Sequence, residues 1–219
     1  MSDATTRKPV LKPLGEVIYS STNTILVQCY KEGTVSIPYK HSVTEGSIVK
    51  IEGSYDNRFS AYGLVTKICN TSLDNIHKPS ALGLSSKELE ELQPQVYDLL
   101  RKELEICLFA YREEKIINYK PTKLIMIHDI VYDVPDNEIR DLTSLDGVIN
   151  LINIVKTNQL NPNLLVDLIS GGYRLRSNEY SYLVQVGQKL SLAFSDEIDN
   201  LIQILKRLSP PKETISQRL

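Results

Sequence analysis

The chain has 219 residues, of which 42% are hydrophobic and 24% are charged, and its formal net charge is −2. These values are typical of a globular protein with room for one large domain or two small ones. The negative balance excludes the large positive field on which non-specific binding to nucleic acid or to an anionic membrane depends.

The cysteines indicate a reducing compartment. Cys29, Cys69 and Cys107 are odd in number, lie far apart and form no CxxC pair. We therefore expect free thiols and a cytoplasmic location rather than a disulfide framework. No run approaches 18 apolar residues, so no membrane insertion is expected. Residues 1–13 are polar, carry two prolines and lack the apolar segment of a signal peptide, which predicts a flexible tail.

Between Leu14 and Asn70, short runs of strand-forming residues alternate with turn residues, and no helical period appears. The runs read GEVIYSS, TILVQCY, TVSIPY, GSIVKIEG and FSAYGLVTKI. This spacing predicts a small barrel or a tight sandwich. Gly63 lies inside the last run, where we expect a bulge or a sharp coil.

The pattern becomes helical after Asn70. Ser85 followed by Glu88 predicts a capping box that opens a helix. Pro94 suits the first position of a second, longer helix. Apolar residues on both sides of Pro94 recur at the spacing of a packing helix, namely Leu92, Val96, Leu99, Ile106 and Ala110.

A late strand interrupts the helical part of the chain. Lys123 to Val134 is rich in Ile and Val and is bounded by prolines, so we predict a strand that pairs with the barrel edge. From Asp141 to Leu208 the chain is expected to be helical. The predicted helices read LTSLDGVINLINIVKTN, NPNLLVDLI, YSYLVQVGQKLSLAF and SDEIDNLIQILKRL.

No motif for a known reaction is present. The sequence lacks GxxxxGK[ST], GxGxxG and GxSxG, so we predict no catalytic residue and no cofactor, and expect neither ATP binding nor ATP hydrolysis. Gly171 and Gly172 are interpreted as a helix end or a close helix crossing. Cys69 and His77 offer only two zinc ligands, so no metal site is predicted.

Two groups of polar residues leave alternatives open. His128, Asp129 and Asp133 on the late strand suit either acid–base work or, more commonly, a solvated strand end. The segment GGYRLRSNEYSY mixes aromatic and cationic side chains that suit a protein interface, stacking on single-stranded nucleic acid, or a plain exposed helix end. We take its members as candidate partner contacts: Tyr173, Arg174, Arg176, Tyr180 and Tyr182.

Several segments resemble one family. LGEVIYSSTNTILVQCY, GSIVKIEG and AYGLVTKI are similar to the HAS-barrel, the six-stranded barrel shared by HerA-type DNA-translocating ATPases and rotary ATP synthase catalytic subunits. The segment VTKICNTSLDNIHKPSALGLSSKELEELQPQVYDLL and the later YLVQVGQKLSLAF resemble the stand-alone cyanobacterial members, which lack the motor domain. The resemblance covers most of Leu14 to Leu208. It implies a contact role, because in the motors such barrels form ring collars or dock partner proteins, and it transfers no catalytic residue.

The expected fold class is α+β, with a small N-terminal six-stranded β-barrel followed by a mostly α-helical C-terminal region. The expected divisions are a flexible tail at 1–13, the barrel at 14–70, a linker with helices and the late strand at 71–136, a helical domain at 137–208 and a disordered tail at 209–219. The expected function is a non-enzymatic assembly or adaptor module that docks a protein partner through its barrel or helical face, with a homo-oligomer as one form. The alternative is a nucleic-acid-associated module beside a nuclease or translocase, although the net charge argues against nucleic acid.

Overall fold

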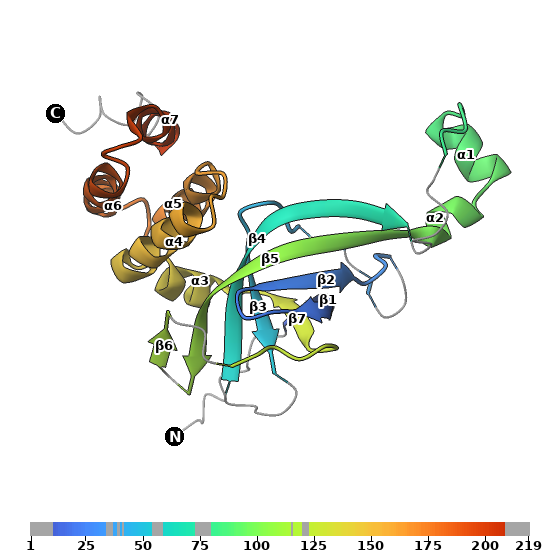
Figure 1. Cartoon of the computed structure of the whole chain (residues 1–219), viewed down its shortest axis with the longest axis horizontal. Helices are drawn as coiled ribbons and strands as arrows, with labels where there is room; N and C mark the ends of the chain where they lie inside the picture. Colours follow the sequence, from blue (N-terminus) through green and yellow to red (C-terminus); the bar gives the residue numbers. More distant parts are fainter. Residues whose placement is uncertain are drawn as a thin grey trace, which may run out of the picture.

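A computed structural model describes residues 11–33, 37–38, 40, 42–53, 59–72, 80–114, 116–119 and 123–208. The predicted C-terminal tail, residues 1–10 of the predicted N-terminal tail and most of the run TVSIPY lie outside these residues. The predicted tail is wrong at its end, because Pro13 is the first residue of a strand and pairs with Tyr132. The N-terminal part of the described chain is a barrel and the C-terminal part is helical, so the α+β prediction is confirmed (Figure 1). No helix in the described part of the chain is long and apolar enough to cross a membrane.

The barrel is closed, six-stranded and antiparallel throughout. Its order is β2-β1-β7-β3-β4-β5, and pairing of β2 with β5 closes the ring. The strands are β1 (Pro13–Ser20), β2 (Thr24–Cys29), β3 (Ile48–Glu52), β4 (Phe59–Ser72), β5 (Leu100–Glu113) and β7 (Ile130–Asp133), and β6 (Ile116–Asn118) is added to the outer side of β5.

Glycine permits a close approach inside the barrel wall. The register of β4 against β5 shifts between Tyr62 and Gly63, which confirms the predicted bulge. A Cβ on Gly63 would lie 2.2 Å from Cγ2 of Ile106. Any larger residue at position 63 would collide with the Ile106 side chain, so glycine allows Ile106 to pack against the β4 backbone.

The prediction of one long helix after Pro94 is wrong. Residues 100–113 form β5, and from Ile106 to Tyr111 the strand is buried on both faces. One face points into the barrel, where Leu108 packs, and the other meets the helical layer, where Phe109 packs. A strand buried on both sides gives a continuous apolar run, and periodicity cannot distinguish such a run from a buried helix.

The late strand does complete the barrel, as predicted. β7 covers only Ile130–Asp133 and pairs with β1 and with β3. Residues 123–129 are not a strand, and His128 within them has a positive φ of 72°. Because β5 and β7 are both barrel strands, the barrel extends well beyond the predicted 14–70.

Five helices form a layer on one side of the barrel: α3 (Asp136–Leu142), α4 (Leu145–Thr157), α5 (Leu164–Arg174), α6 (Tyr180–Ala193) and α7 (Ile198–Leu208). The last four confirm the predicted helices, although α4, α5 and α7 start later than expected. The Asn161 side chain accepts a hydrogen bond from the backbone N–H of Asn163 instead of opening the helix at Pro162.

The helical layer and the barrel share a core. Tyr62, Leu64 and Phe109 from the barrel wall pack in one apolar cluster with buried side chains of α4 to α7. Polar contacts also connect the two parts: Glu138 on α3 accepts hydrogen bonds from Lys50 on β3 and from the Tyr62 hydroxyl on β4. This continuity makes the barrel and the helices one packed body.

Candidate functional site

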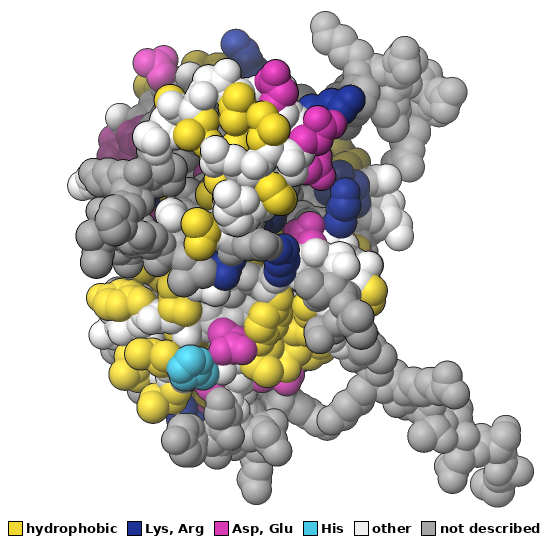
Figure 2. All heavy atoms as spheres, turned by 90° about the vertical axis from the view of Figure 1, so that its right-hand side faces the viewer, with side chains coloured by type: hydrophobic (Ala, Val, Ile, Leu, Met, Phe, Trp, Pro, Cys, Tyr) yellow, Lys and Arg dark blue, Asp and Glu magenta, His cyan; other side chains and the backbone are white. Residues whose placement is uncertain are grey.

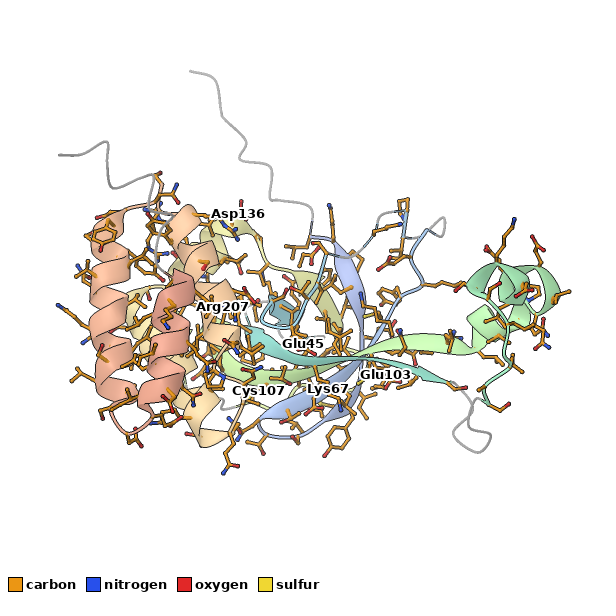
Figure 3. All side chains as sticks on the ribbon, turned by 90° about the horizontal axis from the view of Figure 1, so that it is seen from above. Glu45, Lys67, Glu103, Cys107, Asp136 and Arg207 are labelled. Carbon is orange, nitrogen blue, oxygen red and sulfur yellow. The ribbon has the colours of Figure 1, made fainter. Side chains whose placement is uncertain are left out.

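A two-helix arm projects from this body. We define the arm as residues 80–99, which contain α1 (Ser86–Leu92) and α2 (Gln95–Leu99). It is carried on the outer ends of β4 and β5, whose pairing continues to Ser72 and Leu100 after β2 has stopped pairing at Glu103. Figures 1 and 3 show the arm at the end of this ribbon, at the opposite end of the molecule from the helical layer.

Local hydrogen bonds build the arm. The Ser85 hydroxyl accepts from the backbone N–H of Glu88 at 3.3 Å, and the Glu88 carboxylate accepts from the backbone N–H of Ser85 at 2.8 Å. This confirms the predicted capping box. The hydrogen bond from the Ser85 side chain holds the pKa of Glu88 below its usual value, so Glu88 is an anion. α1 ends before Pro94, which cannot donate a backbone hydrogen bond.

The arm exposes apolar side chains and carboxylates together. No residue of α1 is buried, and Leu92 is 67% exposed. The other exposed leucines of the arm and its base are Leu82, Leu84, Leu99 and Leu100. Glu90 and Glu91 lie between them on α1 and are exposed. Figure 2 looks onto the arm-bearing side of the molecule, where apolar side chains are gathered.

Isolated helices this short are marginal in water, and most helical stability in proteins comes from packing of an apolar face. No side chain of α1 or α2 belongs to either core cluster of the described residues; Leu92 and Leu99 are exposed, and Leu89 and Val96 are partly buried. A surface of this kind marks a site of protein interaction more often than a finished part of a monomer.

An open groove of about 1120 Å³ lies at the root of the arm, between the β1–β2 edge and the β4–β5 ribbon. Glu16 bridges two of its lining residues: the Tyr30 hydroxyl donates to Oε1 at 2.8 Å, and Nδ1 of His128 lies 3.0 Å from Oε2. Hydrogen bonds from His128 and from Tyr30 hold the pKa of Glu16 below its usual value. Sequence reasoning singled out His128 but missed Glu16 and Tyr30, because β1 and β2 carry no local motif there.

The thiol that lines this groove is unsuited to nucleophilic catalysis at neutral pH. Cys29 lines the groove, and burial raises its pKa to about 11, so it is protonated and a poor nucleophile at neutral pH. The Tyr30–Glu16–His128 chain instead ties β1 and β2 to the loop before β7.

The structure does not join His128, Asp129 and Asp133 into an acid–base site. The His128 ring is 78% exposed and bound to Glu16. Asp129 is 1% exposed and accepts from the backbone N–H of Met126, which closes the turn before β7. Asp133 ends β7 and pairs in register with Val49.

The five candidate partner contacts near α5 and α6 do not form one surface. Tyr182 is buried, so its prediction as a contact is wrong. Its hydroxyl donates to the backbone oxygen of Thr143 at 2.9 Å. Tyr173 packs, partly buried, against the helical core, whereas Arg174 and Tyr180 are exposed.

Arg176 acts inside the helical layer. Its guanidinium donates to the Thr143 hydroxyl at 3.1 Å and to the Gly172 carbonyl at 2.9 Å, and also to the Arg140 carbonyl. Gly172 lies in the last turn of α5, in agreement with the predicted helix end, and a Cβ there would lie 2.6 Å from the hydroxyl oxygen of Thr143, the C-cap of α3. Arg176 and Tyr182 therefore make internal contacts, whereas the exposed Arg174 and Tyr180 stay candidate partner contacts.

The thiols are free, as predicted: Cys29 and Cys107 are buried and Cys69 is partly exposed. Among the described residues, no group of three or more His, Cys, Asp or Glu could hold a metal ion. His77, considered above with Cys69, lies outside those residues.

No family model matches this chain, and no curated protein matches it. The barrel is six-stranded, as the resemblance to the HAS-barrel family implies, but a barrel of that size occurs in many families and does not identify one.

Proposed function

We propose that this chain is a non-enzymatic assembly or adaptor module that docks a protein partner, and that the arm is the docking element. The observation that carries the proposal is the unpacked apolar face of α1 and α2, with Leu92 67% exposed and Leu99 47% exposed. The sequence alone favoured the barrel or the helical face. The arm, inserted between two barrel strands, is a surface on which several leucines are exposed together.

The position of the arm supports this role. Because the arm sits on the β4–β5 ribbon, whose inner half belongs to the closed barrel, a partner that binds α1 and α2 is held on a rigid support. Binding of such a partner would bury the leucines that the monomer leaves in water, at about 25 cal/mol per Å² of apolar surface.

The experiment compares capture of partner protein by three tagged forms expressed in the native host. Leu92→Glu places a charge on the arm, and Ile116→Glu is the matched control because Ile116 on β6 is also 67% exposed. Wild type and Ile116→Glu should recover the same partner in about 0.5 M salt, where exposed charge interactions are screened, and Leu92→Glu should lose it.

Equal recovery by Leu92→Glu and wild type would overturn the arm as the docking element. Recovery that disappears with nuclease and with salt would favour the nucleic-acid alternative, since phosphate contacts weaken steeply with salt.

A further inference from the structure

The helical end of the molecule carries a second unpacked apolar surface. We define the hairpin groove as the shallow depression of about 630 Å³ between α6 and α7, lined by Gly187, Gln188, Ser191, Leu192 and Leu205. Gly187 and Ser191 are small, so the two helices leave a trough along their outer side.

Leu192 lines this groove, and further apolar side chains of the same two helices are exposed. On α6, Val184 and Leu192 are 42% and 75% exposed, and on α7, Ile198 and Ile202 are 62% and 42% exposed. The core is served by other residues of the same helices, among them Ile204 and Leu190, which are buried. The apolar surface of α6 and α7 therefore extends beyond the part that the core covers.

The charges of the groove and of the arm are opposite. Lys189 on α6 and Lys206 on α7 are exposed and follow Gln188 and Leu205, which line the groove. Asp199 is the one exposed carboxylate within the two helices, and Asp196 and Glu197 between them are paired with Lys156. The arm carries the exposed carboxylates Glu88, Glu90 and Glu91 against Lys87. An acidic apolar helix is the ligand that an apolar trough bordered by lysines favours.

The arm cannot reach the groove of its own molecule. The two surfaces lie at opposite ends of the chain's fold, as Figures 1 and 3 show, with Arg207 on α7 marking the helical end in Figure 3. The ribbon between them is built from two strands of 14 residues each, a length of about 45 Å.

We propose that the arm of one copy docks in the hairpin groove of a second copy, so that the chain assembles head to tail. This inference rests on the proposed function and names the partner as another copy of this chain. The contact joins two different surfaces, so it is heterologous, and repeated use of it produces a ring if the rotation closes and an open filament if it does not.

The test is complementation between two broken copies, measured by sedimentation velocity over about 1–100 µM, the range of weak protein interfaces. Leu92→Glu keeps the groove and loses the arm. Leu192→Glu keeps the arm and loses the groove, because Leu192 lines it. Each alone should be monomeric, whereas their equimolar mixture should form a 1:1 dimer, because one intact arm then meets one intact groove. Ile116→Glu should assemble as wild type does.

A charge exchange gives a second readout. Lys189→Glu with Lys206→Glu should raise the dissociation constant at least about tenfold, and adding Glu90→Lys with Glu91→Lys to the same chain should restore assembly. All of these positions are exposed, and unchanged circular dichroism would show that the variants fold.

Two results would overturn the head-to-tail contact. One is that the wild-type protein stays monomeric over the whole concentration range, and the other is that the mixture of the two variants stays monomeric. If arm-dependent capture of another protein persists in that case, this inference fails while the proposed function stands. If Leu92→Glu changes neither assembly nor capture, both fail.

Discussion

The guanidinium carbon of Arg176 lies 4.5 Å from the centroid of the Tyr182 ring. The same guanidinium donates to Thr143 and to the carbonyls of α3 and α5, so it ties the chain between α5 and α6 to the start of the helical layer. In sequence, an aromatic–cationic pair of this kind resembles an interface hot spot. In the structure, the pair makes its contacts within the helical layer.

Arg176→Ala should lower the free energy of unfolding by about 2–4 kcal/mol, because it removes charge-assisted hydrogen bonds and leaves acceptors in the helical layer unpaired. Arg174→Ala is the matched control, since Arg174 is exposed, and should change it by less than about 0.5 kcal/mol. Urea denaturation measures both. Partner affinity per folded molecule should be the same in the two variants; a specific loss with Arg176→Ala would restore this residue as a contact.

The second prediction concerns the contact between Glu138 on α3 and the barrel residues Lys50 and Tyr62. Lys50 is 9% exposed and is paired with Glu138, and with the more exposed Glu52. Glu138→Ala should cost about 2–4 kcal/mol of unfolding free energy, because it leaves a buried ammonium group with one partner fewer. Tyr62→Phe removes only one hydrogen bond and should cost about 1 kcal/mol. If the two substitutions cost the same, the ammonium group is not the reason for the loss.

The arm should be stabilised locally by its capping box. Ser85→Ala should reduce amide-exchange protection of α1 and leave the global unfolding midpoint unchanged, since α1 contributes no buried residue to the core. The pKa of Glu88 is depressed in the folded arm, so the capping contribution is present above the usual carboxylate pKa and is lost as the pH falls through the lower folded value. A shift of the global midpoint with Ser85→Ala would show that the arm packs on the body.

The two buried thiols predict how the free energy of unfolding changes at high pH. Burial raises the pKa of both Cys29 and Cys107 from about 9 to about 11. The folded state then binds more protons than the unfolded state, so the unfolding free energy falls as the pH rises from about 9 to about 11. Cys29→Ala with Cys107→Ala should make this fall shallower in denaturation curves. Rapid labelling of either thiol in the native protein at pH 7 would contradict their burial.

The sequence predicted the elements whose signals are local. The Ser85–Glu88 box, the bulge at Gly63 and the four long helices all depend on neighbouring residues, and all are present. β5 was missed because Ile106 to Tyr111 is buried on both faces and has lost the alternation of a strand.

The candidate site was harder to predict, because exposure depends on distant residues. In the sequence, Leu92 and Leu99 appeared to be buried positions of a packing helix. In the structure, α2 ends at Leu99 and strand β5 begins at Leu100, and both leucines are exposed to solvent. Tyr182 appeared to be a surface residue, since nothing near it in sequence indicates that Thr143 accepts its hydroxyl hydrogen. Long-range contacts of this kind leave no periodic trace in a single sequence.

The most direct measurement of the central claim is photo-cross-linking from the arm. A benzophenone side chain is placed at Leu92 or, as the control, at Ile116, which is equally exposed at 67%, and covalent products are identified by mass spectrometry after irradiation of the purified protein and of host extract. The account predicts products from position 92, joined to α6 or α7 of a second copy, and none from position 116. Equal products from the two positions, or none from position 92, would contradict the claim that the arm is a docking element.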